Sequence, residues 1–206
     1  YYIGQVIDKL EEHGLRENTI VIFMSDNGHS EETGNRIRVD NHKSGYPKDH
    51  FYGAYGGGNT GKWRGQKGSF LEGGIRVPAI ISWPGKLPEG VVRSQAITAM
   101  DWFPTILDLC GVEKPKGKLD GHSLVSLCKS PYVPSFHKVL HFQWHKKWAV
   151  REGDWKLLGQ DGREKVSLHN LADKKPEAKD YTAQKPELVA HLKKLHAEWA
   201  KDVFAK

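Results

Sequence analysis

The sequence is poor in cysteine and contains no long hydrophobic run. Only two cysteines, Cys110 and Cys128, occur among 206 residues, so at most one disulfide can form and a zinc site made of three or four cysteines is excluded. No stretch approaches the ~20 consecutive apolar residues of a membrane-spanning helix. The hydrophobic content of 38% and the charged content of 27% are typical of a globular domain.

The chain also lacks a dense stripe of basic residues. Its formal net charge is +6, but the lysines and arginines are spread along the sequence in isolated positions and short pairs. A nucleic-acid-binding domain is expected to concentrate them on one recognisable motif, so we expect no nucleic-acid partner. The mild positive charge fits a solvated basic surface and equally fits attraction of a polyanionic substrate.

The most informative segment is a β-branched, apolar run at residues 19–24 that ends in Ser25-Asp26-Asn27-Gly28. Such a run predicts a strand that is covered on both faces of an α/β sheet. In open α/β sheets, ligands bind beyond the carboxyl ends of strands. The carboxylate of Asp26 and the amide of Asn27 would suit a hard cation such as Ca²⁺ or Mg²⁺ there. An ordinary Asp-Asn-Gly turn has the same sequence, so this segment alone leaves both interpretations open.

Hydrophobic periodicity predicts an alternation of helices and strands around one long polar segment. Helices are expected over residues 2–13, 101–110 and 122–127 and from Pro186 onward, and strands over 77–83, 96–98, 139–144, 148–151, 155–158 and 166–170. Residues 30–69 are polar and rich in glycine and histidine, which predicts a long active-site loop. A change of pattern near residue 130 predicts an α/β core over 1–130 and a small α+β subdomain over 131–206.

A second glycine-rich segment follows, with the sequence Lys67-Gly68-Ser69-Phe70-Leu71-Glu72-Gly73-Gly74-Ile75-Arg76-Val77-Pro78. Together with Ser25-Asp26-Asn27-Gly28, it resembles the sulfatase family of the alkaline-phosphatase-like superfamily. The resemblance continues in order through residues 83–85, 101–107, 120–124 and 150–157, and thus covers nearly the whole chain. It implies part of an alkaline-phosphatase-like core of sheet and helices, followed by a small antiparallel sheet with a covering helix.

The resemblance also implies roles for residues of both motifs. Asp26 and Asn27 resemble the family's late pair of metal ligands, which implies Ca²⁺, with Mg²⁺ as the alternative cation. Lys67 resembles the lysine that contacts the sulfate ester, and it is therefore a candidate catalytic and substrate-binding residue. An ammonium group offers a mobile point charge with three donors for sulfate oxygens. Lys62 and Arg64 lie close in sequence and stay open as alternatives.

Four histidines are candidates for contacts with the substrate. His29 follows the metal-ligand pair directly and would touch the substrate or orient a ligand. His145 resembles a family histidine that reaches the substrate from the small subdomain, but Gln143 stands where related sequences often carry an acid, so a core position is equally open. His42 and His50 lie in the long polar segment, where a solvent-exposed histidine is the simpler interpretation.

Glu72 and Arg76 are expected to act structurally. They flank Gly73-Gly74 just before a predicted strand, where a charged pair could hold the segment in place.

One family feature has no counterpart in this sequence. Sulfatases carry their nucleophile in a Cys- or Ser-x-Pro-Ser-Arg segment, in which the first residue is oxidised to formylglycine, and neither Cys110 nor Cys128 has this context. The resemblance therefore implies the C-terminal portion of a sulfatase. Alone it should be inactive, and without its N-terminal portion it should self-associate through uncovered strands. Residues 1–4 do not form a signal peptide, and we expect a periplasmic, secreted or lysosomal parent protein.

The leading hypothesis is a metal-dependent sulfatase that hydrolyses sulfate esters of carbohydrates or aryl sulfates. The formylglycine hydrate would attack sulfur, release the alcohol and then eliminate sulfate. Two alternatives stay open at this point. A phosphoesterase of the same superfamily would carry Ser or Thr at the nucleophile position, and a non-catalytic module would bind acidic glycans without a metal.

Overall fold

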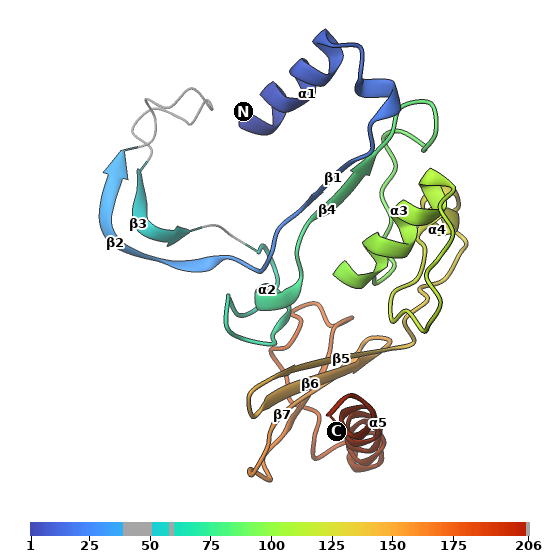
Figure 1. Ribbon diagram of the computed structural model, residues 1–206. Helices are drawn as coiled ribbons and strands as arrows, with labels where there is room; N and C mark the ends of the chain where they lie inside the picture. The colour runs from blue at the N-terminus through green and yellow to red at the C-terminus, as the bar shows by residue number, and fades with distance from the viewer. Residues whose placement is uncertain (39–50, 58–59, 205–206) are drawn as a thin grey trace. The chain divides into compact units, whose positions relative to one another are not determined.

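The computed structural model describes residues 1–38, 51–57 and 60–204. These residues form two compact units, one made of the described residues within 1–5, 23–80 and 139–206 and the other of 6–22 and 81–138. Figure 1 shows the order of the elements along the chain. Within the described ranges, no helix has the length and apolar character needed to cross a membrane. The expected domain boundary near residue 130 stays a prediction.

Helices and short sheets alternate along the chain, which confirms the predicted α/β class. The helices are α1 Tyr2–Glu12, α2 Glu72–Ile75, α3 Trp102–Cys110, α4 Val125–Lys129 and α5 Pro186–Phe204, with 3₁₀ turns at Arg16–Asn18 and Ala99–Asp101. The strands are β1 Val21–Met24, β2 Ser30–Arg38, β3 Phe51–Gly57, β4 Ala79–Ser82, β5 Val139–Trp144, β6 Lys147–Glu152, β7 Trp155–Gln160 and β8 Ser167–Asn170. In the described part of the chain, β1 pairs with β4, β2 with β3, and β5 to β8 form one sheet in sequence order.

The prediction of one long loop over residues 30–69 is wrong, because this stretch contains β2 and β3. The two strands pair in antiparallel fashion, with register shifts between Ser30 and Thr33 and between Thr33 and Arg36. A register shift of this kind inserts an extra residue into one strand and interrupts the alternation of side chains. The period of two that marks a strand in a sequence is therefore lost here. The candidates His42 and His50 lie outside the described residues.

Two further strand predictions need correction. Strand β1 is not fully covered on both faces, because none of its four residues is buried in the part of the chain that the structure describes and Phe23 is 38% exposed. Residues 96–98 do not form a strand. The carboxylate of Asp101 accepts the Thr98 N–H at 2.7 Å and turns the backbone into a 3₁₀ helix.

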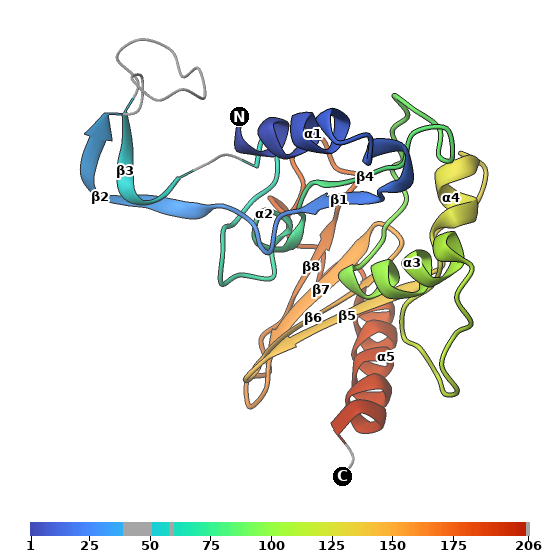
Figure 2. The same ribbon diagram turned by 45° about the horizontal axis from the view of Figure 1, so that its top comes forward.

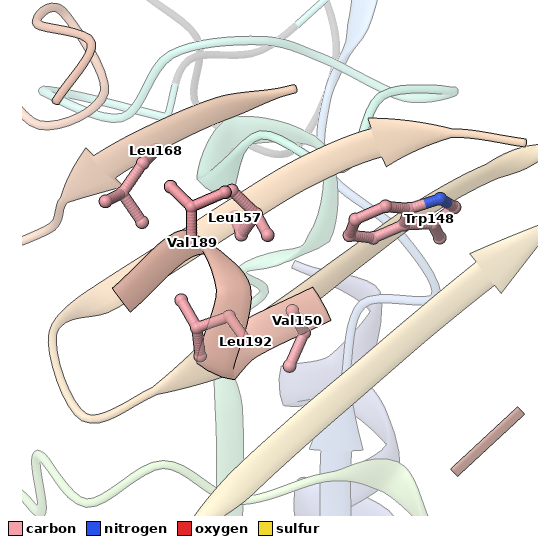
Figure 3. Packing of buried hydrophobic residues seen from close by; sticks show 6 residues of the cluster. All are labelled: Trp148, Val150, Leu157, Leu168, Val189 and Leu192. Atoms are coloured by element: carbon pink, nitrogen blue, oxygen red, sulfur yellow. The ribbon is translucent and has the colours of Figure 1, made fainter. Parts of the chain in front are cut away.

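The four-stranded sheet carries the main hydrophobic core on one face. Val150, Leu157 and Leu168 lie opposite one another on β6, β7 and β8, and all three are fully buried. They pack against Val189 and Leu192 of α5, as Figure 3 shows. Figure 2 shows the same helix lying along this sheet. The predicted antiparallel sheet with a covering helix is thus confirmed.

The opposite face of this sheet is charged. Because successive side chains of a strand point to opposite faces, the residues next to the core row, Arg151, Lys156 and His169, share the other face. Lys156 is nonetheless fully buried. A buried ammonium is costly unless it is paired, so this face must meet negative charge.

Two histidines complete the contact between the sheet and α5. The ring of His141 stacks on that of Trp199, with 4.9 Å between the ring centroids, and the ring of His196 stacks on that of Trp148, with 4.6 Å between the centroids. Burial, and to a smaller extent the neighbouring His196, lower the pKa of His141 to about 4. Burial also lowers the pKa of His196, although the carboxylate of Asp161 acts in the opposite direction. Both rings are therefore neutral in the folded protein near pH 7.

We expect acid to weaken this contact. Because the folded state disfavours protonated His141, the unfolded state binds the proton first, and the free energy of unfolding should fall as the pH drops from about 6.5 toward about 4. Substitution of His141→Phe should keep the stacking and reduce this slope in urea unfolding curves measured across that pH range. His13→Phe, at an exposed histidine, is the control. An undiminished slope in His141→Phe would contradict the assignment.

Candidate active site

The turn that follows β1 lies directly against the glycine-rich segment. The Gly28 N–H donates to the carbonyl of Gly74 at 3.0 Å, and the Lys67 N–H donates to the carbonyl of His29 at 2.8 Å. These main-chain hydrogen bonds hold together two motifs that are far apart in the sequence.

The approach is close because the contacting residues have no side chains. A Cβ atom at Gly28 would lie 1.9 Å from the carbonyl oxygen of Gly73, and one at Gly73 would lie 2.3 Å from that of Gly65. A Cβ atom at Gly74 would lie 2.3 Å from the carbonyl oxygen of Ser69. These distances are far below van der Waals contact, and the obstacle is backbone in each case. Packing therefore requires glycine at all three positions.

A methyl group at Gly28 should separate the two motifs. Gly28→Ala would need a backbone shift, and we expect a loss of about 1–3 kcal/mol in the free energy of unfolding, as for other overpacked sites. Gly4→Ala is the matched control, because a Cβ atom at this helical position meets nothing within 4 Å. Urea unfolding of both variants tests the contact, and equal stability of the two would contradict it.

Asp26 and Asn27 lie at the end of β1, the first exposed and the second half-buried. Within the described ranges, the carboxylate of Asp26 has no hydrogen-bond or ion-pair partner. Carboxylate and amide oxygens are the donors that Ca²⁺ prefers, but Ca²⁺ takes six to eight of them. No group of three or more His, Cys, Asp or Glu residues that could hold a metal occurs among the residues the structure describes. The donor set therefore fits two ligands of a hard-cation site, and any such site would need further ligands from elsewhere.

Lys67 and His29 lie beside this pair. Lys67 is exposed, and its backbone bonds to that of His29, two residues after Asn27. The Nδ1 atom of His29 lies 3.0 Å from the carbonyl of Ser30, which assigns the proton to Nδ1 and leaves Nε2 as an acceptor in the neutral ring. The structure thus brings four of the five predicted site residues into one region.

His145, the fifth predicted residue, lies at the turn between β5 and β6. It is exposed, and its backbone has a left-handed φ of 51°. Its ring lies 5.1 Å from that of Trp144, and in the described part of the chain no hydrogen bond or ion pair joins it to Asp26 or Lys67. A role for His145 in substrate binding stays a prediction.

Glu72 forms a buried charged cluster behind the Lys67 segment. Its carboxylate lies 2.8 Å from Nε of Arg76 and 2.8 Å from Nζ of Lys156, and a guanidinium nitrogen of Arg151 lies at 3.7 Å. The residue is only 2% exposed. The predicted structural pair of Glu72 and Arg76 is confirmed. The carboxylate of Glu72 also supplies the negative charge that the charged face of the C-terminal sheet requires.

Glu177 supplies a second buried carboxylate to this cluster. It accepts the backbone N–H of Glu72 at 2.9 Å, and its other oxygen lies 3.0 Å from Nζ of Lys156. Its carbonyl accepts a hydrogen bond from the guanidinium of Arg64. Neither Lys156 nor Glu177 is exposed at all, so the ammonium lies between two carboxylates in a site closed to water.

The sequence analysis missed Lys156 and Glu177. Strand alternation gives a partial signal for Lys156, because its neighbour Leu157 faces the core and Lys156 must therefore lie on the other face of the sheet. Alternation cannot show which residues pack against that other face. Glu177 follows Pro176 in a polar stretch that looks like an ordinary surface turn, and no signal in the sequence identifies it.

The cluster should make stability depend on acid. Burial would raise the pKa of Glu72, but the charges and hydrogen bonds of Lys156 and Arg76 outweigh it and hold the pKa below the ordinary value of 4.5. A lowered pKa stabilises the folded state above pH 4.5, and this stabilisation is lost as the pH falls through the lower, folded-state value.

Glu72→Gln should therefore destabilise the protein at pH 7, by about 3–5 kcal/mol as for other broken buried ion pairs, and by much less at pH 3. Urea unfolding at both pH values measures the difference. Glu113→Gln, at an exposed position that forms no ion pair with any residue the structure describes, should change neither value. A Glu72→Gln penalty that is equal at pH 7 and pH 3 would contradict the ionised state of Glu72.

Two family models match this chain. The model described as Sulfatase matches residues 1–112, and that described as N-sulphoglucosamine sulphohydrolase, C-terminal, matches residues 62–202. The chain belongs to the sulfatase family. The first match contains both motifs of the candidate site, and the second contains the Lys67 segment and the C-terminal sheet.

Curated relatives agree with this assignment. Human Arylsulfatase D is 37% identical over 158 residues, which cover 71% of this chain and 24% of the relative. Mouse Steryl-sulfatase is 36% identical over 167 residues, which cover 76% of this chain and 24% of the relative. This sulfatase chain thus spans about a quarter of the length of these relatives.

Solved structures show the same fold. A protein solved in complex with its substrate D-glucosamine-2-N,6-O-disulfate superposes with a TM-score of 0.67 at 21% identity, over 97% of this chain and 37% of its own. The PsFucS1 sulfatase from Pseudoalteromonas sp. superposes with a TM-score of 0.63 at 24% identity, over 96% of this chain and 40% of its own. The predicted fold, the C-terminal region of an alkaline-phosphatase-like sulfatase, is confirmed.

Proposed function

We propose that the protein to which this chain belongs is a metal-dependent sulfatase that hydrolyses sulfate esters. One observation carries the proposal. Main-chain hydrogen bonds from Gly28 to Gly74 and from Lys67 to His29 join the turn with two oxygen donors to a loop with an exposed lysine. A cation and an ammonium group in one region suit a doubly charged, oxygen-rich group such as a sulfate ester.

In this proposal Asp26 and Asn27 are two of the ligands of a Ca²⁺ ion, with Mg²⁺ as the alternative. A cation bound there would supply charge neutralisation at the sulfuryl group. The formylglycine nucleophile of the family would come from a part of the protein outside this chain. Lys67 would bind a sulfate oxygen through its ammonium group, which stabilises the negative charge that develops in the transition state.

A sulfated carbohydrate is the proposed substrate class. The family model of the C-terminal part is named for N-sulphoglucosamine sulphohydrolase, and a structural relative was solved with a sulfated glucosamine. The formal net charge of +6 would favour the approach of an anionic sugar. Aryl sulfates are convenient test substrates, because several curated relatives are named arylsulfatases. A periplasmic, secreted or lysosomal location is part of the same proposal.

Lys67→Ala and Asp26→Ala in the complete protein test the two roles. We expect each to lower kcat/KM for an aryl sulfate by about 10²–10³, the usual cost of removing one group that stabilises transition-state charge. Asp26→Ala should also lower the calcium that remains bound after gel filtration, measured by elemental analysis, whereas Lys67→Ala should not.

Lys116→Ala is the matched control, because Lys116, like Lys67, is an exposed lysine followed by a glycine of positive φ. It should leave both activity and bound calcium unchanged. Normal sulfatase activity in Lys67→Ala would contradict the proposed role of the lysine. Phosphate-ester hydrolysis that exceeds sulfate-ester hydrolysis in the unsubstituted protein would contradict the substrate class.

A further inference from the structure

The loop that carries Lys67 is closed at its base by residues that bind to the C-terminal sheet and to the segment after it. We propose that Lys156 and Glu177 are positioning residues, which hold this loop so that Lys67 can bind the sulfate group. This inference rests on the proposed function, because it assumes that Lys67 contacts the substrate.

The hydrogen bonds around Lys67, from the Ser69 N–H and hydroxyl to the carbonyl of Gln66 and from the Lys67 N–H to that of His29, do not join the loop to the C-terminal sheet. Lys67 lies between Gly65 and Gly68, whose φ angles of 82° and 85° are both in the left-handed region. Glycine adopts such angles readily but also visits many others. A charged side chain on such a loop needs an external constraint if it is to stay aimed at one place.

The constraint acts at both ends of the loop. The Gly73 N–H donates to the carbonyl of Arg64 at 2.6 Å and closes the base. On one side the Arg64 guanidinium donates to the carbonyl of Glu177, and on the other side the Glu72 N–H donates to the Glu177 carboxylate at 2.9 Å. Glu177 thus binds both ends of the loop, at Arg64 and at Glu72. Its own φ of 60° is unusual for a residue with a side chain, and in this conformation both its carbonyl and its carboxylate reach the loop.

Lys156, on strand β7 of the sheet, binds both carboxylates of this arrangement. Its ammonium lies 2.8 Å from the carboxylate of Glu72 and 3.0 Å from that of Glu177, and none of the three side chains is more than 3% exposed. Without the ammonium, the two buried carboxylates would repel each other. Apolar residues of similar volume are often as stable as a buried ion pair. The charged cluster is therefore better explained by the fixed geometry that it imposes on the loop.

A double-mutant cycle on the complete protein separates positioning from general destabilisation. Lys156→Met removes the ammonium while filling the space, and we expect kcat/KM for an aryl sulfate to fall about tenfold to a hundredfold, as for a misplaced catalytic group. In the Lys67→Ala background, Lys156→Met should cause almost no further loss, because the group it positions is gone. All rates are measured below the melting transition of every variant.

Three further variants keep the test decisive if Lys156→Met does not fold. Glu177→Gln keeps an oxygen that can accept the Glu72 N–H, and it should retain more activity than Glu177→Ala. Val189→Ala destabilises the same C-terminal subdomain through its hydrophobic core, without touching the cluster. It should lower the melting temperature while leaving kcat/KM unchanged.

The outcomes distinguish the inference from the proposed function. If Lys67→Ala lowers activity and the losses from Lys67→Ala and from Lys156→Met or Glu177→Ala simply multiply, the positioning role is wrong and the sulfatase proposal survives. A loss in Val189→Ala as large as that in Lys156→Met would also overturn the positioning role. If Lys67→Ala has no effect, the role that we propose for Lys67 fails, and the inference fails with it.

Discussion

The buried carboxylate of Glu72 is the constraint on which the rest of this structure depends. An ionised group that is closed to water must be surrounded by compensating charge, and the fold delivers that charge from several elements. Lys156 lies on β7, Arg151 lies on β6, and Arg76 directly follows α2. The four-stranded sheet therefore needs two different faces, an apolar one for α5 and a charged one for Glu72. That division is visible in the register of its strands.

Two kinds of contact act together around the candidate site. The glycines remove side chains, so that the turn after β1 and the Lys67 segment can meet through their backbones. The charged cluster holds the other side of the same segment against the sheet. Glycine alone would leave the segment free to adopt many conformations, and charge alone could not bring two backbones so close. The combination gives an exposed lysine a fixed base beside an exposed carboxylate.

Much of this could be predicted from the sequence. Turn residues after an apolar run located Asp26 and Asn27, and alternation and periodicity located the hairpin of β6 and β7 and the long helix α5. The remainder depends on contacts that a local pattern cannot contain. Register shifts hide the strand β2. Lys156 meets a carboxylate 84 positions away in the sequence, so neither its burial nor its partner could be inferred from its neighbours.

The most direct test of this account is a crystal structure of the complete protein with a bound sulfated sugar or a slowly hydrolysed analogue. The account predicts a sulfate oxygen within hydrogen-bonding distance of the Lys67 ammonium, and a cation coordinated by Asp26 and Asn27. The Lys67 loop should keep its contacts with the charged cluster around Glu72. A sulfate group bound elsewhere, with Lys67 in solvent and no cation at Asp26, would contradict the account.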